Sequence, residues 1–327
     1  MTASEATLPP HEALSGVEVL IAQLPDDAVI GSVDWNGYRV WVKRSRGADH
    51  WLSRFRTGLF MLLARYLGRG LPLSAPVADH GVCLEAARLR HYADLGLNVP
   101  RVLYAQADHF VIEDAGPGLR NELEATGLEQ ERAAILDEAL DNLIGFHQHR
   151  EWHGGAQLRN LTRKSGEVQR IDFEEPYAGR VALPLLQVLD LCLQLSSADR
   201  YSTAAHRKTM GRRWFLSVGS ASVGMAAKRV LSLLYALAAF PLLKLARYEH
   251  RRIRAAIDAL EGAIEVGVSR GLAKHPYRPA MPMRWRTVAV AFALMLAADD
   301  VLEFAMEYDD YPEEVIELLM PAEEREV

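Results

Sequence analysis

The stretch Trp152–Pro176, WHGGAQLRNLTRKSGEVQRIDFEEP, decides the fold. His153 is followed by Asn160 seven residues later, a KSGE turn comes next, and Asp172 ends a short apolar strand. A turn of this kind predicts a β-hairpin whose two arms bring Asn160 and Asp172 to the same end of the ribbon. An amide and a carboxylate held together in this way are suited to bind a hard divalent cation.

The residues before this stretch combine two hydrophobic periods. Residues 17–24 and 26–44 alternate apolar and polar side chains as strands do, and Asn36-Gly37 within the second run indicates a tight hairpin turn. Five further segments have strand or helix spacing. They are helices expected over 50–69, 82–95 and 128–147, and strands expected over 101–107 and 109–114.

After the hairpin the pattern is helical throughout. The sequence predicts helices over 184–197, about 207–240, 242–270 and 283–308. Strands and helices are mixed early in the chain, and helices alone follow. The predicted fold class is therefore α+β, with a small mixed sheet lobe, a helical lobe and extra C-terminal helices.

The composition fits a folded protein of the cytoplasm. Its 327 residues suffice for two or three folding units, and 50% hydrophobic with 24% charged residues allow a packed core. Cys83 and Cys192 lie in apolar contexts without metal-ligand spacing, which favours buried thiols in a reducing compartment. The first residues lack the features of a secretory signal, and no apolar run of about eighteen residues predicts a simple membrane span.

Charge is distributed unevenly along this chain of net charge −6. Between His206 and Arg254 there are eleven Lys or Arg and one acid, Glu249, and we call this segment the basic belt. From Asp299 onward the balance reverses to twelve acids and one Arg. The helix expected over 50–69 is also basic and apolar.

Basic apolar helices favour the headgroup region of an anionic bilayer, and the plainer interpretation is that they pack together and expose their cations to water. The apolar content of the belt exceeds what contact with nucleic-acid phosphates requires, so nucleic-acid binding is disfavoured.

Five motifs follow one another within residues 27–200. They are VWVK, ending at Lys43; CLEAARLRHYADLGLNVP, containing Glu85; HFVIEDAGPG; WHGGAQLRN; and IDFEEP, containing Asp172. In this order they resemble the protein-kinase-like fold, and specifically its compact bacterial branch of lipopolysaccharide core (Kdo/heptose) kinases and RIO-type small kinases. Glu174 stands where larger kinases have glycine, as is usual in this branch.

The resemblance implies ATP and Mg²⁺ as cofactors and assigns roles to particular residues. Lys43 resembles the strand lysine that holds the nucleotide phosphates, and Glu85 resembles the helix glutamate that pairs with it. Asn160 and Asp172 resemble the metal ligands, and their oxygens suit Mg²⁺. Glu113, Asp114 and Ala115 resemble the hinge, whose backbone would hydrogen-bond the adenine.

One departure from the family pattern concerns catalysis directly. When the motif is aligned on His153 and Asn160, the catalytic aspartate of the family falls on Gly155. A general base contributes about 10²–10⁴-fold, and phosphoryl transfer has a loose transition state, so its loss weakens an enzyme without abolishing activity. His153 itself is expected to brace the loop through hydrogen bonds.

Three functions remain open at this point. The first is an active kinase-like phosphotransferase in which Gln157 orients the acceptor and Glu174 or Glu175 accepts its proton, or in which the acceptor is already an anion. The second is a pseudokinase that binds nucleotide together with a protein partner or a membrane. The third transfers another group, such as a nucleotidyl group. The retained lysine and metal ligands favour the first, because a pure scaffold has no physical need of magnesium ligands.

The resemblance also implies a structural role for Asp190 and the kind of acceptor and its location. Asp190, isolated in an apolar helix, resembles the aspartate that fixes the catalytic loop, while His147 and His149 are expected to be helix-end residues without a catalytic role. The expected acceptor is an envelope glycolipid or lipid-linked sugar at the cytoplasmic surface of the inner membrane. The three predicted parts are a nucleotide-binding lobe over 1–115 with an inserted amphipathic helix at 50–69, a catalytic-type lobe over 116–205, and a helical extension with an acidic tail over 206–327.

Overall fold

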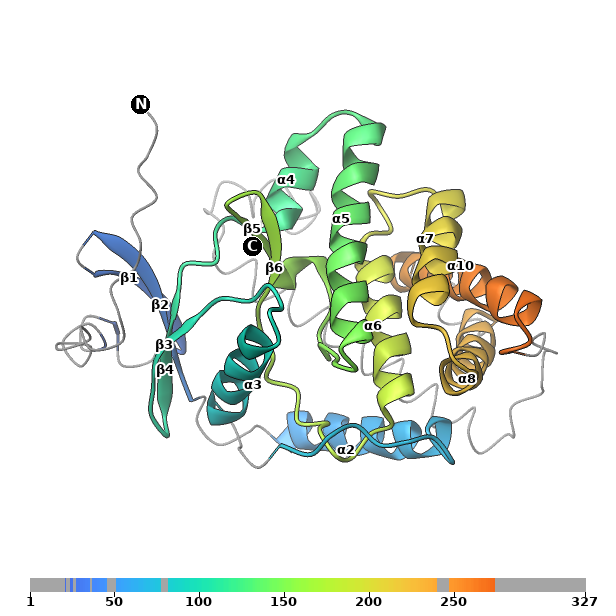
Figure 1. Ribbon diagram of the computed structural model, residues 1–327, viewed down its shortest axis with the longest axis horizontal. Helices are drawn as coiled ribbons and strands as arrows, with labels where there is room; N and C mark the ends of the chain where they lie inside the picture. The colour runs from blue at the N-terminus through green and yellow to red at the C-terminus, as the bar shows by residue number, and fades with distance from the viewer. Residues whose placement is uncertain are drawn as a thin grey trace, which may run out of the picture.

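The computed structural model in Figure 1 has a mixed α+β fold, with a small antiparallel sheet lobe beside a larger helical region. It describes residues 28–35, 37–45, 51–77, 82–239 and 247–273, together with positions 21, 24 and 25. Most of the strand predicted over 17–24, the helix predicted over 283–308 and the acidic segment from Asp299 lie outside these residues.

The sheet has four strands in the order β1-β2-β4-β3, and each pair is antiparallel. The hairpin predicted at Asn36-Gly37 is confirmed, because Trp35 lies opposite Tyr38 and Gly37 has a φ of 84°, which glycine adopts without strain. The strands predicted near 101–107 and 109–114 are also confirmed. The bounds are β1 (Ile30–Trp35), β2 (Tyr38–Arg44), β3 (Val102–Ala105) and β4 (His109–Glu113).

The two faces of the sheet enter different hydrophobic clusters. Val40 and Val42 of β2 are buried on one face with Val33 and Val111. Successive side chains of a strand point to opposite faces, so Lys43 points to the other face. That face carries α3 (Val82–Asp94), and its cluster joins residues of α3 and the sheet to Phe146 and Phe173.

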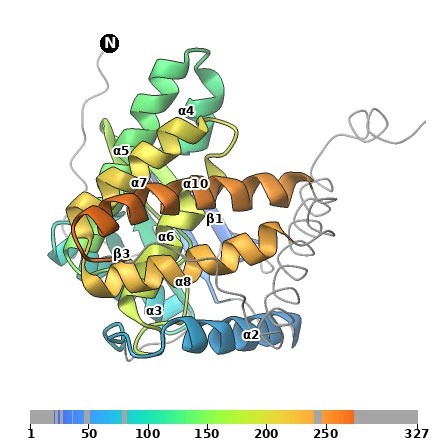
Figure 2. The ribbon, with the colours of Figure 1, turned by 90° about the vertical axis from the view of Figure 1, so that its right-hand side faces the viewer.

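The helical region is built around one large core that includes residues from Leu63 to Ile264. A short hairpin, β5 (Leu161–Lys164) and β6 (Glu167–Arg170), lies where the sheet lobe meets this region, as the KSGE turn predicts. Figure 2 shows α7, α8 and α10 crossing in front of α6. The helices are α2 (Trp51–Leu67), α4 (Leu119–Ala125), α5 (Glu129–Gln148), α6 (Leu183–Ser197), α7 (Ala204–Val218), α8 (Ala221–Ala238) and α10 (Arg247–Ser269).

The structure corrects one prediction about helices and adds one helix that was not predicted. The single helix expected over about 207–240 is two helices, because Ser220 caps a new helix by accepting a hydrogen bond from the Val223 amide. A side chain on Gly219 would also lie 2.3 Å from the Phe215 carbonyl oxygen, so the chain must turn there on a glycine. The helix α4 was not predicted, since only Leu119 and Leu123 mark its buried face.

The helix predicted at 50–69 packs with the helical region. Leu63, Ala64 and Leu67 of α2 enter the large core. The Arg229 guanidinium on α8 donates to the carbonyl oxygens of Leu67 and Arg69, at 2.7 and 2.8 Å. Both contacts satisfy carbonyls at the C-terminal end of α2, which fixes this helix against α8.

The part of the basic belt that lies on α7 is neutralised within the fold. Three cations of α7 form ion pairs with acids of α10 that follow Arg254 in sequence, and Arg213 pairs with Asp137 and Asp141 of α5. The pairs with α10 are Arg207 with Asp258, Lys208 with Glu261, and Arg212 with Glu265. For α7, therefore, the structure agrees with the plainer interpretation, in which the helices pack together.

α8 is the one helix in the described part of the chain that is long and apolar enough to cross a membrane by length and composition. Its mean hydropathy is 1.3, and 44% of its residues are buried inside the fold. It also packs against α6 and α10. Of the two cysteines, Cys192 is buried as expected and Cys83 is half-buried.

Candidate functional site

Lys43 and Glu85 form a buried ion pair between the sheet and α3. The Lys43 ammonium lies 2.6 Å from Oε2 of Glu85, whose side chain is only 4% exposed. β2 directs Lys43 toward α3, and Glu85 lies in the first turn of that helix, so the pair joins two elements that are 42 residues apart in sequence. The pairing implied by the family resemblance is thus present in the structure.

Asp172 reaches the same ammonium from the helical region. Its Oδ1 lies 2.8 Å from the Nζ of Lys43, and Glu174 approaches the same nitrogen at 3.4 Å. Asp172 follows β6 and has a φ of 68°, in the left-handed region that non-glycine residues rarely adopt. The next amide, of Phe173, donates to Oε1 of Glu85 at 3.2 Å and thereby holds the turned backbone in place.

Asn160 completes this group from the other arm of the hairpin. It ends a short 3₁₀ turn, Leu158–Asn160, and its amide nitrogen donates to the Gly155 carbonyl at 2.8 Å and to Oδ2 of Asp172 at 3.4 Å. The backbone carbonyl of Asn160 also accepts a hydrogen bond from the Ile171 amide at 3.1 Å. The two predicted metal ligands are therefore adjacent, as the hairpin argument requires.

Opposing effects set the charge states of this cluster. Burial alone would lower the pKa of Lys43, but the carboxylates of Glu85, Asp172 and Glu174 raise it well above its ordinary value. Burial alone would raise the pKa of Asp172, but the Lys43 ammonium holds it below its ordinary value. Burial raises the pKa of Glu85 above its ordinary value, although the Lys43 ammonium acts to lower it. Lys43 and Asp172 are accordingly charged near neutral pH.

The donor set fits a divalent cation. Carboxylate oxygens of Glu85, Asp172 and Glu174 lie within 4.8 Å of one another, and Asn160 adjoins Asp172. With all three acids ionised, three negative charges face the single positive charge of Lys43, which leaves an excess of two. Mg²⁺ takes oxygen ligands and commonly uses one or two carboxylates, so Asp172 and Asn160 would suffice to hold it.

His153 braces the loop, as predicted. Its Nδ1 accepts a hydrogen bond from the Gly155 amide at 3.0 Å, so the proton is on Nε2, which lies 2.9 Å from the Ile171 carbonyl. The ring is fully buried, and this burial lowers the pKa of His153 to about 3. A neutral, doubly hydrogen-bonded imidazole of this kind positions the backbone and does not exchange protons at neutral pH.

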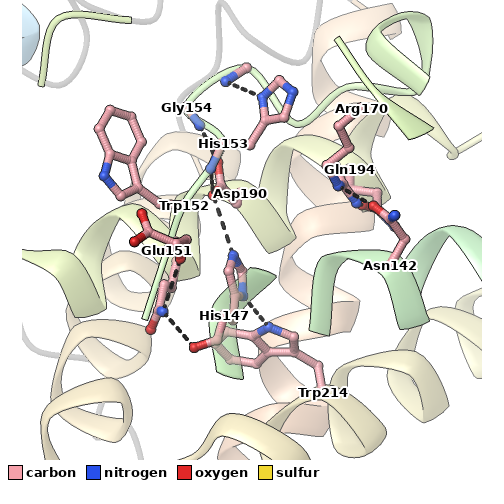
Figure 3. Close-up of polar contacts among 12 residues, drawn as sticks. Asn142, His147, Glu151, Trp152, His153, Gly154, Arg170, Asp190, Gln194 and Trp214 are labelled. Carbon is pink, nitrogen blue, oxygen red and sulfur yellow. Dashed lines mark hydrogen bonds and ion pairs between the residues drawn. The ribbon is translucent and has the colours of Figure 1, made fainter. Parts of the chain in front are cut away.

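Asp190 holds the same loop from below, as Figure 3 shows. Its carboxylate accepts from the amides of His153 and Gly154, at 2.7 and 2.8 Å, and contacts Nε2 of His147 at 3.3 Å. Although burial opposes it, the hydrogen bonds from His147 and the loop hold the pKa of Asp190 below its ordinary value. The structure thus provides the partners that an isolated buried carboxylate requires.

His147 is more than a helix-end residue. It is completely buried, and its Nδ1 accepts a hydrogen bond from the indole of Trp214 on α7 at 2.8 Å. Its Nε2 proton is therefore directed at Asp190. His149, in contrast, is exposed at the end of α5, as the sequence predicts.

Arg88 is a residue of the candidate site that the sequence did not reveal. Its guanidinium donates to the carbonyls of Phe173, Trp152 and His153, at 2.9, 2.7 and 3.1 Å, and stacks 4.0 Å from the Trp152 ring. It thereby ties α3 to both segments that carry the site. The signal was its position one turn after Glu85, which the sequence equally permits as a surface ion pair.

The loop residues that were predicted to serve the acceptor occupy distinct positions. Because position 155 is a glycine, it provides no carboxylate to the loop. Gln157 is half-buried, and its backbone amide donates to the Gly155 carbonyl. The Gln157 side chain forms no hydrogen bond with any residue that the structure describes. A side chain on Gly154 would collide with Glu175, at 2.8 Å from its Cβ, so Glu175 lies directly over this loop.

The predicted hinge begins at Glu113, the last residue of β4. The Glu113 amide already donates to the Arg101 carbonyl at 3.1 Å, which shifts any adenine contact to the backbone beyond it. The side chain of Asp114 accepts from the Trp41 indole at 2.9 Å, and Ala115 is buried. These contacts fix the segment between the sheet and the helical region.

Comparisons with known proteins add no family assignment. No protein-family model matches the chain, and no curated protein matches it significantly.

Proposed function

We propose that this chain is an ATP- and Mg²⁺-dependent phosphotransferase with a two-lobed kinase-like fold. The observation that carries the proposal is the convergence of Lys43, Glu85 and Asp172, with contacts of 2.6 and 2.8 Å to one ammonium. These residues come from β2, α3 and the segment after β6, and Asn160 of the 3₁₀ turn adds a hydrogen bond to Asp172. Such a group offers a cation for phosphates and oxygen ligands for a metal ion, the two needs of phosphoryl transfer.

In the proposed mechanism Lys43 binds the phosphates and Glu85 keeps its ammonium in place. Asp172 and Asn160 hold Mg²⁺, which supplies charge neutralisation for the transferred phosphoryl group. Asp190 and His153 fix the loop that faces the acceptor. The sheet lobe, through the backbone that follows Glu113, binds the adenine.

The acceptor is proposed to be an envelope glycolipid or lipid-linked sugar. A phosphate or carboxylate on such a molecule is already an anion and needs no base, which accords with Gly155. For a hydroxyl acceptor, Glu175 is the better placed of the two neighbouring acids. Glu174 lies 3.4 Å from Lys43, whereas Glu175 lies against Gly154.

The second candidate is a pseudokinase, and the observation in its favour is the glycine at position 155. Both candidates predict nucleotide binding, since they share Lys43 and Asp172. They differ in turnover, because only the phosphotransferase consumes ATP.

Asp172→Ala distinguishes the two candidates when it is assayed for ATP consumption with a bacterial membrane extract. We expect the wild-type protein to consume ATP and Asp172→Ala to lose this activity, while Asp94→Ala, which changes an exposed aspartate at the end of α3, retains it. Thermal stabilisation by ATP and Mg²⁺ is measured in parallel, and a ligand at about 100 times its Kd adds about 2.7 kcal/mol. Stabilisation of the wild type without turnover would identify the pseudokinase, and neither response would refute both.

A further inference from the structure

The segment from Trp51 to Val77 is basic and contains no acidic residue. It carries four arginines and no Asp or Glu, in a protein of net charge −6. Within it the exposed positions Gly58, Leu62 and Arg65 recur at helical spacing along α2, and Arg69 continues the row. We call the exposed residues Leu62, Arg65, Arg69 and Leu73 the α2 face.

The α2 face combines cations with apolar side chains. Leu62 is 49% exposed and Leu73 is 62% exposed, among the most exposed large hydrophobic residues described. Arg65 and Arg69 are exposed and form no ion pair with any described residue. Arg207 and Arg212 of α7 differ in this respect, since α10 supplies their counter-charges.

The opposite side of α2 is anchored, so this face is held outward. Leu63 and Leu67 are buried in the large core, and Arg229 binds the C-terminal carbonyls of the helix. Figures 1 and 2 both show α2 along the lower edge of the molecule, outside α6 and α8. An amphipathic helix in this position can lie flat on a surface without unfolding.

The chain after α2 is also joined to the acceptor side of the candidate site. The amide and the hydroxyl of Ser74 both donate to the Val181 carbonyl at 3.0 Å, and the hydroxyl accepts from the Gly179 amide at 3.0 Å. The ring of Phe60 on α2 contacts Tyr177 at 4.5 Å between centroids. These contacts attach the segment that follows the IDFEEP motif directly to α2.

We propose that the α2 face docks this protein on an anionic phospholipid bilayer and thereby presents lipid-linked acceptors to the candidate site. Its arginines complement lipid phosphates, and Leu62 and Leu73 can enter the interface between headgroups and acyl chains. A nucleic acid would match the arginines but leave the leucines exposed to water. The inference rests on the proposed function, because it names the surface from which that site would take its substrate.

The test is co-sedimentation of the full chain, without nucleotide, with vesicles of phosphatidylcholine alone or mixed equally with phosphatidylglycerol. We expect binding to the mixed vesicles that weakens with added salt. The triple variant Leu62→Asp, Arg65→Glu, Arg69→Glu should bind at least about 30-fold more weakly, since each surface arginine contributes about fivefold. All three side chains are exposed, so the fold should be retained.

The matched control is Leu128→Asp, Arg90→Glu, Arg101→Glu, which makes the same changes at exposed positions elsewhere. It should bind as the wild type does. Equal binding of the two triple variants, or indifference of the wild type to phosphatidylglycerol, would overturn the inference. So would a loss of thermal stability in the α2 variant without a change in vesicle binding, because another part of this chain would then cover the face. Vesicle binding is independent of turnover, so failure here is distinguishable from failure of the phosphotransferase proposal.

Discussion

At the scale of single residues, the loop glycine at position 155 provides the sharpest test of catalysis. A Cβ at this position would lie 3.2 Å from Nδ2 of Asn160 and 3.8 Å from the His153 ring, so a side chain fits after a small shift. We expect Gly155→Asp to raise the rate of ATP consumption by about 10²-fold or more, because it supplies the missing base. Steady-state rates with a bacterial membrane extract, and the KM for ATP, are the measurements.

Gly154→Asp is the control for this substitution. Gly154 has a φ of 99°, and a side chain there would lie 2.8 Å from atoms of Trp152 and Glu175, so this variant should lose stability and gain no activity. If Gly155→Asp folds normally and its rate equals that of the wild type, an absent base does not limit the reaction. The acceptor would then be an anion.

The buried imidazole of His153 predicts how stability depends on pH. Its folded pKa of about 3 lies below the ordinary value of 6.5, so the unfolded chain takes up the proton first as the pH falls. The stabilisation is complete above pH 6.5 and is lost progressively toward pH 3. We expect the free energy of unfolding to fall by about 2 kcal/mol between pH 6.5 and pH 5 from this group.

Urea titrations at pH 7 and pH 5 measure this effect. His153→Gln should be less stable at pH 7 and should show a smaller difference between the two pH values. An unchanged pH difference in the variant would assign the acid sensitivity to other groups. His147, whose pKa burial also lowers, would be the next to test.

The site residues that could be predicted are those that belong to recognisable sequence patterns, such as a strand, a hairpin or a motif. The hairpin brings Asn160 to Asp172, so this contact follows from local structure. Lys43 lies 129 residues from Asp172, and its place in the site was expected only from the family resemblance. Arg88 could not be found in this way. Its partners are backbone carbonyls 64 to 85 residues away, and nothing in the sequence marks a carbonyl as the partner of an arginine.

At the scale of elements, α3 is held to the site by Arg88. We expect Arg88→Gln to lower the free energy of unfolding by about 3 kcal/mol, because three buried carbonyls would lose charged hydrogen bonds. Movement of α3 would also displace Glu85 from Lys43, so stabilisation by ATP and Mg²⁺ should decrease. Urea denaturation and thermal shift measure these two effects.

Arg90→Gln is the matched control, since Arg90 lies on the same helix and is exposed. It should change the free energy of unfolding by less than about 0.5 kcal/mol. Equal effects of the two substitutions would show that helix propensity or net charge, and not the contact with the loop, determines the stability of α3.

Elements with a strong period were predictable, and their neighbours in space were not. The hairpin at Gly37 and the long helix α5 agree with the sequence patterns to within a few residues. The break at Gly219 was missed because small residues on both sides continue the helical period. The position of α2 could not be predicted either, because the apolar side of a helix does not specify which hydrophobic core it packs into.

At the scale of the whole molecule, a hydrogen-bond path joins the C-terminal helices to the loop of the site. Trp214 donates to His147, which contacts Asp190, which accepts from His153 and Gly154. The helices after residue 205 also share one hydrophobic core with those before it. A shared core and a shared polar path favour unfolding of both parts together.

We therefore expect the wild-type protein and Trp214→Phe each to unfold in a single cooperative transition. The substitution should shift the midpoint of this transition without dividing it into two. The phenyl ring keeps most of the buried volume, but the Nδ1 of His147 loses its donor, so the free energy of unfolding should fall by about 1–3 kcal/mol. Tryptophan fluorescence and far-UV circular dichroism in urea should give coincident midpoints for both proteins. The control is Trp35→Phe, which changes a buried indole in β1 that has no described hydrogen-bond partner. It should lower the free energy of unfolding by less than Trp214→Phe does. Two separate transitions, with only one of them shifted by Trp214→Phe, would instead mean that the helices after residue 205 fold as an independent unit, and the loop of the site would not depend on them.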